Sequence, residues 1–321
     1  MEQQADTTPR LAFQFPGQGS QHVGMGKALA ERFPSARRTF EEADDILGFA
    51  LSRLCFEGPA ETLTDTVNAQ PAILTTSIAA LRALAEATDG RIVPDYYIGH
   101  SLGEYSALVA AGALTFADGL RLVRLRGELM QEAGRARPGG MMAVIGLDAR
   151  VLEEICRQAS DDERVVQVAN DNAPGQVVLS GDMHSLERAG ELAKEAGARR
   201  IIRLAVSIAA HSRLMARAAE GLRRAVHAVS LQPPAAPVVA NVDARPIHTP
   251  EEVRQELVAQ LTAPVRWTDS IRELARRGVG HFVEIGPGSV LTGLVGRIVG
   301  TASATSVGDS DAVLAFAQVW R

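Results

Sequence analysis

The feature that most constrains this fold is a tight turn that carries a serine between two glycines. Residues Gly99–Gly103 read Gly-His-Ser-Leu-Gly; the apolar stretch Asp95–Gly99 predicts a strand before the turn, and Leu102–Ala111 predicts a helix after it. In such a setting the glycines permit a sharp turn that displays the serine at the carboxyl end of the strand. The pattern predicts an α/β fold with Ser101 as a candidate nucleophile. The alternative is a tight packing turn with an exposed serine.

Strands and helices alternate along the two flanking parts of the chain. The first part holds an apolar strand at Leu11–Phe15, a Pro16–Ser20 turn, and helices at Gln70–Ala87 and Thr115–Ala133. The alternation returns near the C-terminus, with helices at 212–228, 250–261, 267–277 and 290–299 and strands at 237–241 and 282–285. This order is typical of an α/β domain with a mainly parallel sheet.

The middle of the chain has a different order of elements. The expected elements are strands at 141–146, 165–169, 176–180 and 201–206, with helices at 149–158 and 185–196. This β-α-β-β-α-β order is the split βαβ unit of ferredoxin-like folds. It begins after Arg137–Gly140, a segment with one proline and two glycines that interrupts regular secondary structure. We therefore expect a small subdomain over residues 137–206, inserted in a large domain made of residues 1–136 and 207–321.

Charge and composition exclude several classes of protein. With 33 basic and 38 acidic residues among 321, the formal net charge is −5, which argues against a nucleic-acid or anionic-membrane partner. The polar stretch 1–9 lacks the apolar core of a signal peptide, and no apolar run approaches the roughly 18 residues of a membrane span. Cys55 and Cys156 fit reduced core thiols, and no spacing suggests a metal site. A cytoplasmic location is expected.

A catalytic serine needs a base, and His211 is the strongest of the seven histidines. It follows the small apolar segment Ser207–Ala210, which predicts a strand, and it precedes a helix. It would then lie at the same sheet edge as Ser101. His22, in the first loop, is a second candidate. A serine esterase or lipase remains open here, although it would need an acid between serine and histidine, and the sequence singles out none.

Six segments occur in chain order: Phe15–Gln21, Gly99–Glu104, Arg124–Gln131, Asn172–Val178, Gln260–Trp267 and Phe282–Gly288. Together they resemble the malonyl-CoA:acyl carrier protein transacylase family and the related acyltransferase domains of polyketide synthases. The resemblance runs from about residue 11 to residue 300. It implies an α/β-hydrolase-like large domain with an inserted ferredoxin-like subdomain, in line with the elements above.

The resemblance also implies roles for individual residues. Ser101 would attack a thioester carbonyl while His211 removes its proton. The main-chain N–H groups of Gln18 and Leu102 would hold the oxyanion. Gln260 would orient His211 through its main-chain carbonyl and so replace the acid of a full triad. The family needs no permanently bound cofactor or metal.

Two positions bear on the acyl group. Arg126 occupies the position of the family's substrate arginine, where a guanidinium can hold the free carboxylate of malonate through two parallel hydrogen bonds. Such charged bonds contribute about 1.5–3 kcal/mol each. Many malonyl-selective members have phenylalanine directly before the catalytic histidine, whereas this chain has Ala210. The smaller residue leaves room for methylmalonyl or a bulkier extender.

The expected activity is transfer of malonyl from malonyl-CoA to the phosphopantetheine thiol of an acyl carrier protein in fatty acid biosynthesis, by a monomeric enzyme. A freestanding acyltransferase of a polyketide pathway is the nearest alternative; a serine esterase and a non-catalytic scaffold follow. Carrier proteins are usually acidic, so a local basic patch would help docking. Arginines that could form it are Arg199, Arg200, Arg203, Arg276, Arg277 and Arg297.

Overall fold

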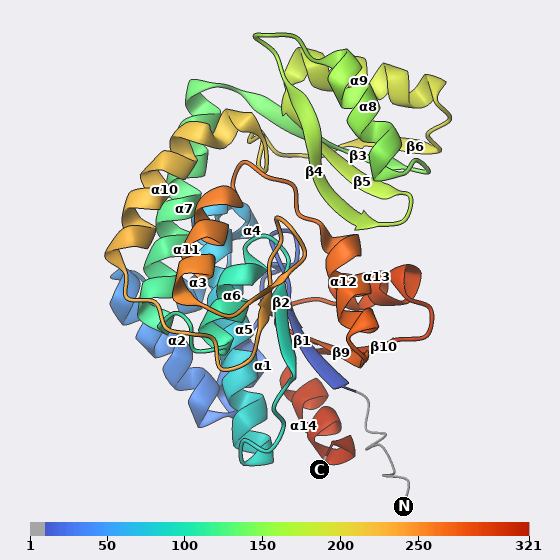
Figure 1. Cartoon of the computed structure of the whole chain (residues 1–321). Helices are drawn as coiled ribbons and strands as arrows, with labels where there is room; N and C mark the ends of the chain where they lie inside the picture. Colours follow the sequence, from blue (N-terminus) through green and yellow to red (C-terminus); the bar gives the residue numbers. More distant parts are fainter. Residues whose placement is uncertain (1–9, 321) are drawn as a thin grey trace, which may run out of the picture.

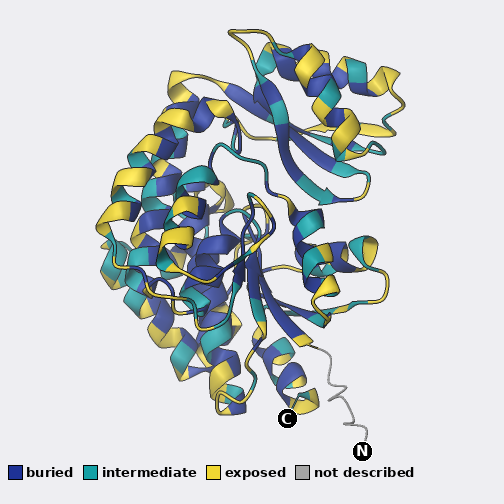
Figure 2. Cartoon of the chain, viewed as in Figure 1, coloured by how far each residue is buried: buried dark blue, intermediate teal, exposed yellow. Residues whose placement is uncertain are grey.

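A computed structural model describes residues 10–320, and its larger sheet has six strands in the order β10-β9-β1-β2-β7-β8. All neighbouring strands are parallel except β7 and β8. Side chains of β1 alternate between the two faces, with Phe13 and Phe15 in one core and Ala12 in the other. The sheet is therefore buried on both sides, as Figure 2 shows. Its strands are β1 (Arg10–Phe15), β2 (Tyr96–Gly99), β7 (Val238–Val239), β8 (Pro246–Ile247), β9 (Val279–Ile285) and β10 (Ser303–Val307).

Helices cover both faces of this sheet (Figure 1). On one face, α5 and α6 contact the strands and α7 packs against α5; on the other, α12 and α13 pack against β9. The main helices are α2 (Pro34–Leu47), α5 (Thr66–Thr88), α6 (Gly103–Ala110), α7 (Phe116–Ala136), α10 (Ala216–Ala228), α11 (Pro250–Ala259), α12 (Trp267–Arg276), α13 (Val290–Ile298) and α14 (Ser310–Val319). The short ones are α1 (Lys27–Arg32), α3 (Leu51–Glu57), α4 (Ala60–Thr64) and the 3₁₀ helix η1 (Arg213–Met215).

The second sheet is antiparallel, with strand order β4-β5-β3-β6 and two helices on one face. Its elements are β3 (Gly139–Ile145), α8 (Ala149–Ala159), β4 (Val166–Ala173), β5 (Gln176–Asp182), α9 (Met183–Glu195) and β6 (Arg200–Arg203). Order and pairing are those of a ferredoxin-like unit. The α/β fold class is confirmed. The domain limits at 136/137 and 206/207 remain a prediction.

The two sheets are joined along β4. Asp171 N–H donates to Val265 O at 3.0 Å, and Val265 N–H donates to Ala169 O at 2.8 Å. His100 Nε2 lies 2.8 Å from Asn172 Oδ1, so the serine turn itself contacts β4. The carboxyl ends of β1, β2, β7 and β9 therefore lie at the edge of the large sheet that faces the small one (Figure 1).

Two of the corrections that the structure makes to the expected elements bear on the site. Ser207–Ala210 is not a strand: this segment lies against α7, where Gly134 leaves room for Ile208. The second strand of the small sheet does not end at residue 169 but continues to Ala173, because Asn170 and Asp171 pair with β5. Only Pro174 and Gly175 form the turn. The helices over 34–64, β10 and α14 had no counterpart in the sequence prediction.

Candidate active site

The serine turn is tight because two glycines allow backbone segments to touch. A Cβ on Gly99 would lie 1.9 Å from Gly103 O, and a Cβ on Gly103 would lie 2.1 Å from Phe15 O. Ser101 between them has φ 51°, a left-handed conformation that L-residues rarely adopt. The strand–turn–helix arrangement expected from the sequence is present. It places the Ser101 hydroxyl at the start of α6.

Ser101 and His211, which are distant in sequence, form a short hydrogen bond. Ser101 Oγ lies 2.7 Å from His211 Nε2. His211 Nδ1 lies 2.9 Å from Gln260 O and 3.2 Å from Ala263 O. Carbonyl oxygens only accept, so Nδ1 carries the ring proton and Nε2 is left to accept the serine proton. The main-chain carbonyl of Gln260 occupies the place of the acid in a triad.

Burial keeps His211 neutral. Its side chain is 3% exposed. Desolvation, followed by the positive charge of Arg126, lowers the pKa of His211 to about 3. The imidazole therefore holds its acceptor lone pair at neutral pH, which is the form that a general base needs.

The conformation of His211 is set by contacts from other elements. Its φ is 57°, the second left-handed residue of the site. Gln167 on β4 donates through Nε2 to His211 O at 3.1 Å and to Thr262 O at 3.2 Å, and its Oε1 accepts from Arg213 N–H at 3.1 Å. Ser212 Oγ donates to Ala209 O at 2.7 Å. The small sheet thus holds the loop that carries the base.

A buried cation lies beside the serine. Arg126 on α7 is 2% exposed, and its Nη2 donates to Ser101 Oγ at 3.1 Å and to Gln260 Oε1 at 3.2 Å. Its Nη1 donates to Gln70 Oε1 at 2.7 Å. The guanidinium also lies 5.7 Å from the centre of the Tyr105 ring. No carboxylate within residues 10–320 forms an ion pair with it, and Nε has no acceptor there.

Two main-chain donors lie beside the serine turn. Leu102 precedes the first turn of α6, where the helix dipole is positive. Gln18 lies in the turn after β1, and its side-chain Oε1 accepts from Thr66 Oγ1 at 3.0 Å. Among the residues that the structure describes, the N–H groups of Gln18 and Leu102 donate to no other group. They are available to an oxyanion.

Comparison with known proteins agrees with this geometry. The family model for the acyl transferase domain matches residues 12–315. The chain belongs to the acyl transferase family. It is 48% identical over 304 residues to the malonyl CoA-acyl carrier protein transacylase of Bacillus subtilis strain 168, with 95% of each chain covered.

Solved structures of other acyl transferases share the whole fold. An acyl carrier protein S-malonyltransferase from Vibrio cholerae matches with a TM-score of 0.93 at 43% identity, covering 96% of this chain and 99% of that one. A malonyl-transacylase in complex with its type II PKS acyl-carrier protein matches with a TM-score of 0.92 at 44% identity, covering 97% and 99%. The family resemblance inferred from the six segments is confirmed.

Within this acyl transferase, Ala210 is half-buried and directly precedes His211. Alanine places a single methyl group directly before the base. His22, the second candidate base, lies 3.3 Å from Ser20 O through Nδ1 and makes no contact with Ser101. The structure therefore brings His211, and not His22, to the serine.

Sequence patterns did not identify three residues that hold the site. Asn241 accepts from Ser101 N–H through Oδ1 at 2.7 Å and donates through Nδ2 to Gly99 O at 2.8 Å. Gln70 supports Arg126, and Glu104 accepts a hydrogen bond from Gln260. Gln70 was detectable as a polar residue at the start of an apolar helix. Asn241 carried no signal beyond its place at the end of an expected strand.

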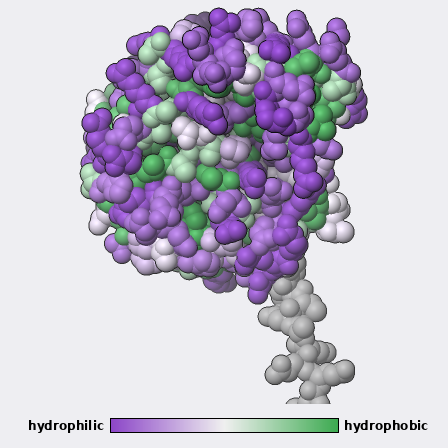
Figure 3. Space-filling model, turned by 45° about the horizontal axis from the view of Figure 1, so that its top comes forward, coloured by the Kyte–Doolittle hydropathy of each residue, from purple (hydrophilic) through white to green (hydrophobic). Residues whose placement is uncertain are grey.

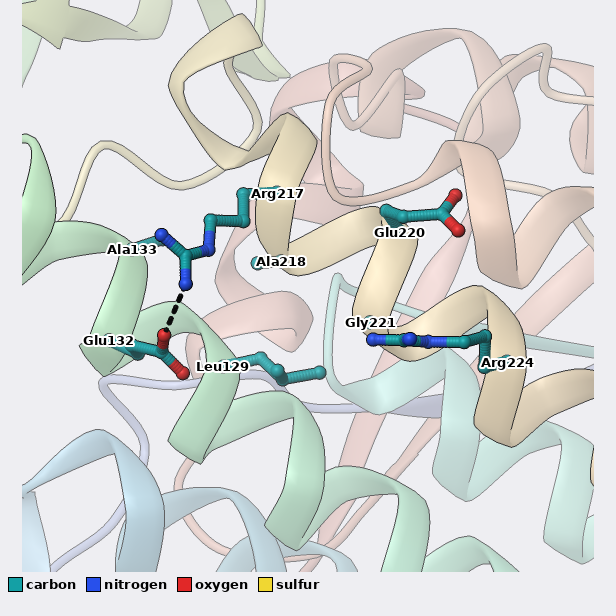
Figure 4. Close-up of a pocket in the computed structure, with 8 residues that line it drawn as sticks. All are labelled: Leu129, Glu132, Ala133, Arg217, Ala218, Glu220, Gly221 and Arg224. Carbon is teal, nitrogen blue, oxygen red and sulfur yellow. Dashed lines mark hydrogen bonds and ion pairs between the residues drawn. The ribbon is translucent and has the colours of Figure 1, made fainter.

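A separate pocket lies between α7 and α10, away from the serine (Figure 4). Leu129 and Gly221 line its floor, and Arg217 donates to Glu132 at 3.0 Å across one end. No residue of the Ser101 site lines it. Within residues 10–320 no group of three or more histidine, cysteine or acidic side chains could hold a metal ion, and no helix is long and apolar enough to cross a membrane.

Proposed function

We propose that this acyl transferase moves a malonyl group from malonyl-CoA to the phosphopantetheine thiol of an acyl carrier protein, in fatty acid biosynthesis. The reaction has two half-reactions joined by an ester on Ser101. The names of the relatives, a malonyl CoA-acyl carrier protein transacylase and an acyl carrier protein S-malonyltransferase, support this substrate and acceptor.

The observation that carries the proposal is the position of Arg126. It is a buried guanidinium that donates to the nucleophile oxygen itself and has no acidic partner among the described residues. A buried cation of this kind favours an anionic ligand, and the planar donor pattern suits a carboxylate. Malonyl carries a carboxylate two bonds beyond its thioester carbonyl, whereas acetyl has none. An esterase of neutral substrates has no use for such a group.

In the first half-reaction, His211 Nε2 takes the proton of Ser101 as Oγ attacks the thioester carbonyl of malonyl-CoA. The carbonyl oxygen becomes an oxyanion, which accepts from the N–H groups of Gln18 and Leu102. The C–S bond then breaks, and His211 returns the proton to the leaving CoA sulfur. Gln260 O stabilises the transient imidazolium through Nδ1–H. The product is malonyl-Ser101 and free CoA.

The second half-reaction reverses these steps with a different thiol. The carrier protein's phosphopantetheine sulfur attacks the Ser101 ester while His211 removes its proton. The same two N–H groups hold the oxyanion, and the proton returns to Ser101 Oγ as the C–O bond breaks. One base thus serves both thiols, so the two thiols occupy the site in turn, as in a ping-pong mechanism.

The acceptor would dock on the rim near the small sheet. Arg199 and Arg200 are exposed and form no ion pair within the described residues, whereas Arg203, Arg276 and Arg277 have acidic neighbours. On the face shown in Figure 3, hydrophilic residues predominate and hydrophobic ones form scattered patches. Such a surface suits a charged partner more than an apolar one.

We propose that the enzyme is a cytoplasmic monomer when it meets the carrier.

A polyketide-pathway acyltransferase is the second candidate, favoured by Ala210. A small residue before the base leaves space for a substituent on C2 of malonyl. The relative solved with a type II PKS acyl-carrier protein shares the fold at 44% identity. The two functions use the same chemistry and differ in the extender unit and the carrier.

Competition among malonyl-, methylmalonyl-, ethylmalonyl- and acetyl-CoA for transfer to a holo acyl carrier protein tests the proposal. We expect malonyl to be preferred and acetyl to be poorest. Preference for a C2-substituted malonyl would favour the polyketide role. Equal use of acetyl would reject the carboxylate clamp. Arg199→Glu with Arg200→Glu should raise KM for the carrier protein and leave malonyl-enzyme formation unchanged.

A further inference from the structure

Two buried carboxyl groups lie directly behind the nucleophile turn. Glu104 is in the first turn of α6 and is 0% exposed, and Glu256 on α11 is 7% exposed. One N–H, that of Asn241, donates to both: to Glu104 Oε1 at 2.9 Å and to Glu256 Oε1 at 3.0 Å. Their side chains are hydrogen-bonded to each other. No step of the proposed mechanism uses either group.

Glu104 reaches the reacting groups through the side chain of Gln260. Gln260 Nε2 donates to Glu104 Oε2 and, at 2.9 Å, to Ser101 O. With both amide protons fixed in this way, its Oε1 faces Arg126 Nη2 at 3.2 Å. The main-chain oxygen of the same residue accepts from His211 Nδ1 at 2.9 Å. Gln260 thus contacts the main chain of Ser101, the guanidinium of Arg126 and the ring of His211.

Two negative charges are unfavourable at this place. Burial, followed by the charge of Glu256, raises the pKa of Glu104 well above its usual range. Burial raises the pKa of Glu256 to about 7. A carboxyl hydrogen-bonded to a carboxylate shares a proton, so the pair holds at least one proton near neutral pH.

We propose that Glu104 is a positioning residue which, paired with Glu256, holds Gln260 so that Arg126 and His211 meet the malonyl thioester together. The inference deepens the proposed function and rests on it. Glu104 touches no substrate. It acts through the amide of Gln260, and its proton keeps the local charge low enough for the clamp to retain its attraction for malonate.

The charged and titratable groups around the pair come from three parts of the chain. Arg126 approaches from α7, Tyr105 from α6, and Asp243 from the loop after β7. Arg126 is the sole cation among them. Loss of the shared proton at high pH would add a negative charge beside Arg126 and weaken its hold on a carboxylate. The pair's raised pKa also means that stability is present at low pH and is lost as pH rises through the folded-state values.

Three variants separate positioning from general stability. Glu104→Ala removes the acceptor for Gln260. Glu104→Gln keeps an acceptor oxygen for Gln260 and a donor for Glu256, while Asn241 N–H keeps its acceptor on Glu256. Asp309→Ala removes the N-cap of α14, a helix that carries neither carboxyl group nor Gln260, so it lowers stability alone. For each, the measurements are thermal stability, and KM and kcat for malonyl and acetyl loading of the full chain.

We expect Glu104→Ala to lower the malonyl-over-acetyl loading ratio about tenfold, the size of one lost hydrogen bond, mainly through KM. Glu104→Gln should keep the ratio near that of the wild type, and Asp309→Ala should change stability alone. The inference is overturned by a Glu104→Ala enzyme that loads with the wild-type ratio and is only less stable. Failure of wild-type enzyme to form any malonyl ester would instead reject the proposed function.

A pH profile decides the matter even when Glu104→Ala does not fold. Malonyl loading by the wild type should decline on the alkaline side as the pair loses its proton. Glu104→Gln cannot ionise at this position, so that decline should disappear or move to higher pH. Identical alkaline limbs in the two enzymes would contradict the role given to the proton of Glu104.

Discussion

Ser101 and His211 have nearly the same unusual backbone conformation, with φ of 51° and 57°, yet the chain holds them in different ways. The serine turn is shaped by its own neighbours, since Gly99 and Gly103 allow it to close on itself, and Asn241 adds a bond to Ser101 N–H from outside. The histidine is fixed from a distance, by Gln260 O, Ala263 O and the side chain of Gln167. The bend at the nucleophile therefore depends mainly on local glycines, whereas the base depends wholly on tertiary contacts. Substitutions in the serine turn and substitutions in the His211 loop should therefore affect stability and activity differently.

The largest effect is expected on the serine side. A Cβ on Gly99 would lie 1.9 Å from Gly103 O and 2.0 Å from Gly103 C, both backbone atoms that cannot move aside. Gly99→Ala should lose more than about 4 kcal/mol of folding free energy or fail to fold. Chemical denaturation followed by circular dichroism measures this. Gly293→Ala on α13 meets no atom within 4 Å and should be neutral or slightly stabilising. Equal stability of the two variants would mean that the turn is looser than its contacts indicate.

Arg126 acts on both the serine turn and the histidine loop, since it donates to Ser101 Oγ and its charge lowers the pKa of His211. Arg126→Ala should reduce malonyl loading by about a hundredfold, the loss of one or two charged hydrogen bonds, with a far smaller effect on acetyl loading. Steady-state loading with both CoA esters measures the ratio. Arg121→Ala, an exposed position on the same helix, serves as the control. Equal losses for the two esters would show that Arg126 supports the fold and does not select the substrate.

A smaller effect is expected on the histidine side. Gln167→Ala removes the two bonds that hold His211 O and Thr262 O, at 3.1 and 3.2 Å. The base should then be misplaced for part of the time, so kcat for malonyl loading should fall about tenfold while KM changes little. Gln158→Ala on the outer face of α8 is the matched control. A drop in stability with unchanged kcat would show that the His211 loop holds its own shape.

The smallest change is expected from mild acid. Because the pKa of His211 is lowered to about 3, its imidazole stays neutral from pH 7 to pH 5. An ordinary histidine, with a pKa near 6.5, would lose roughly thirtyfold of its basic form at pH 5. Single-turnover malonyl loading should therefore remain nearly constant over this interval. A decline centred near pH 6.5 would place the base in a more hydrated setting than its burial indicates.

The same contrast explains what the sequence could and could not predict. The Ser101 turn, the parallel sheet and the ferredoxin-like unit follow from local patterns of glycines and apolar residues. The strand expected over Ser207–Ala210 was wrong because packing against α7 overrides a short apolar pattern. His211 was expected near Ser101 because that strand would end beside it. In the structure a loop carries His211 to Ser101, through contacts that no local sequence pattern encodes.

Polar support residues were the least predictable part. Asn241, Gln70 and Glu256 act through hydrogen bonds to residues distant in sequence, and a single buried amide or acid carries no periodic signal. Glu104 lay within a recognised motif, but its partner Gln260 is 156 residues away. Only the folded chain shows that they meet.

The central claim is that malonyl becomes an ester on Ser101. Intact-protein mass spectrometry after mixing the enzyme with malonyl-CoA, in the absence of any carrier protein, tests it most directly. The account predicts one malonyl adduct on the wild type, mapped by peptide analysis to Ser101, and none on a folded Ser101→Ala variant. An unmodified wild type, or an adduct that persists in Ser101→Ala, would contradict it.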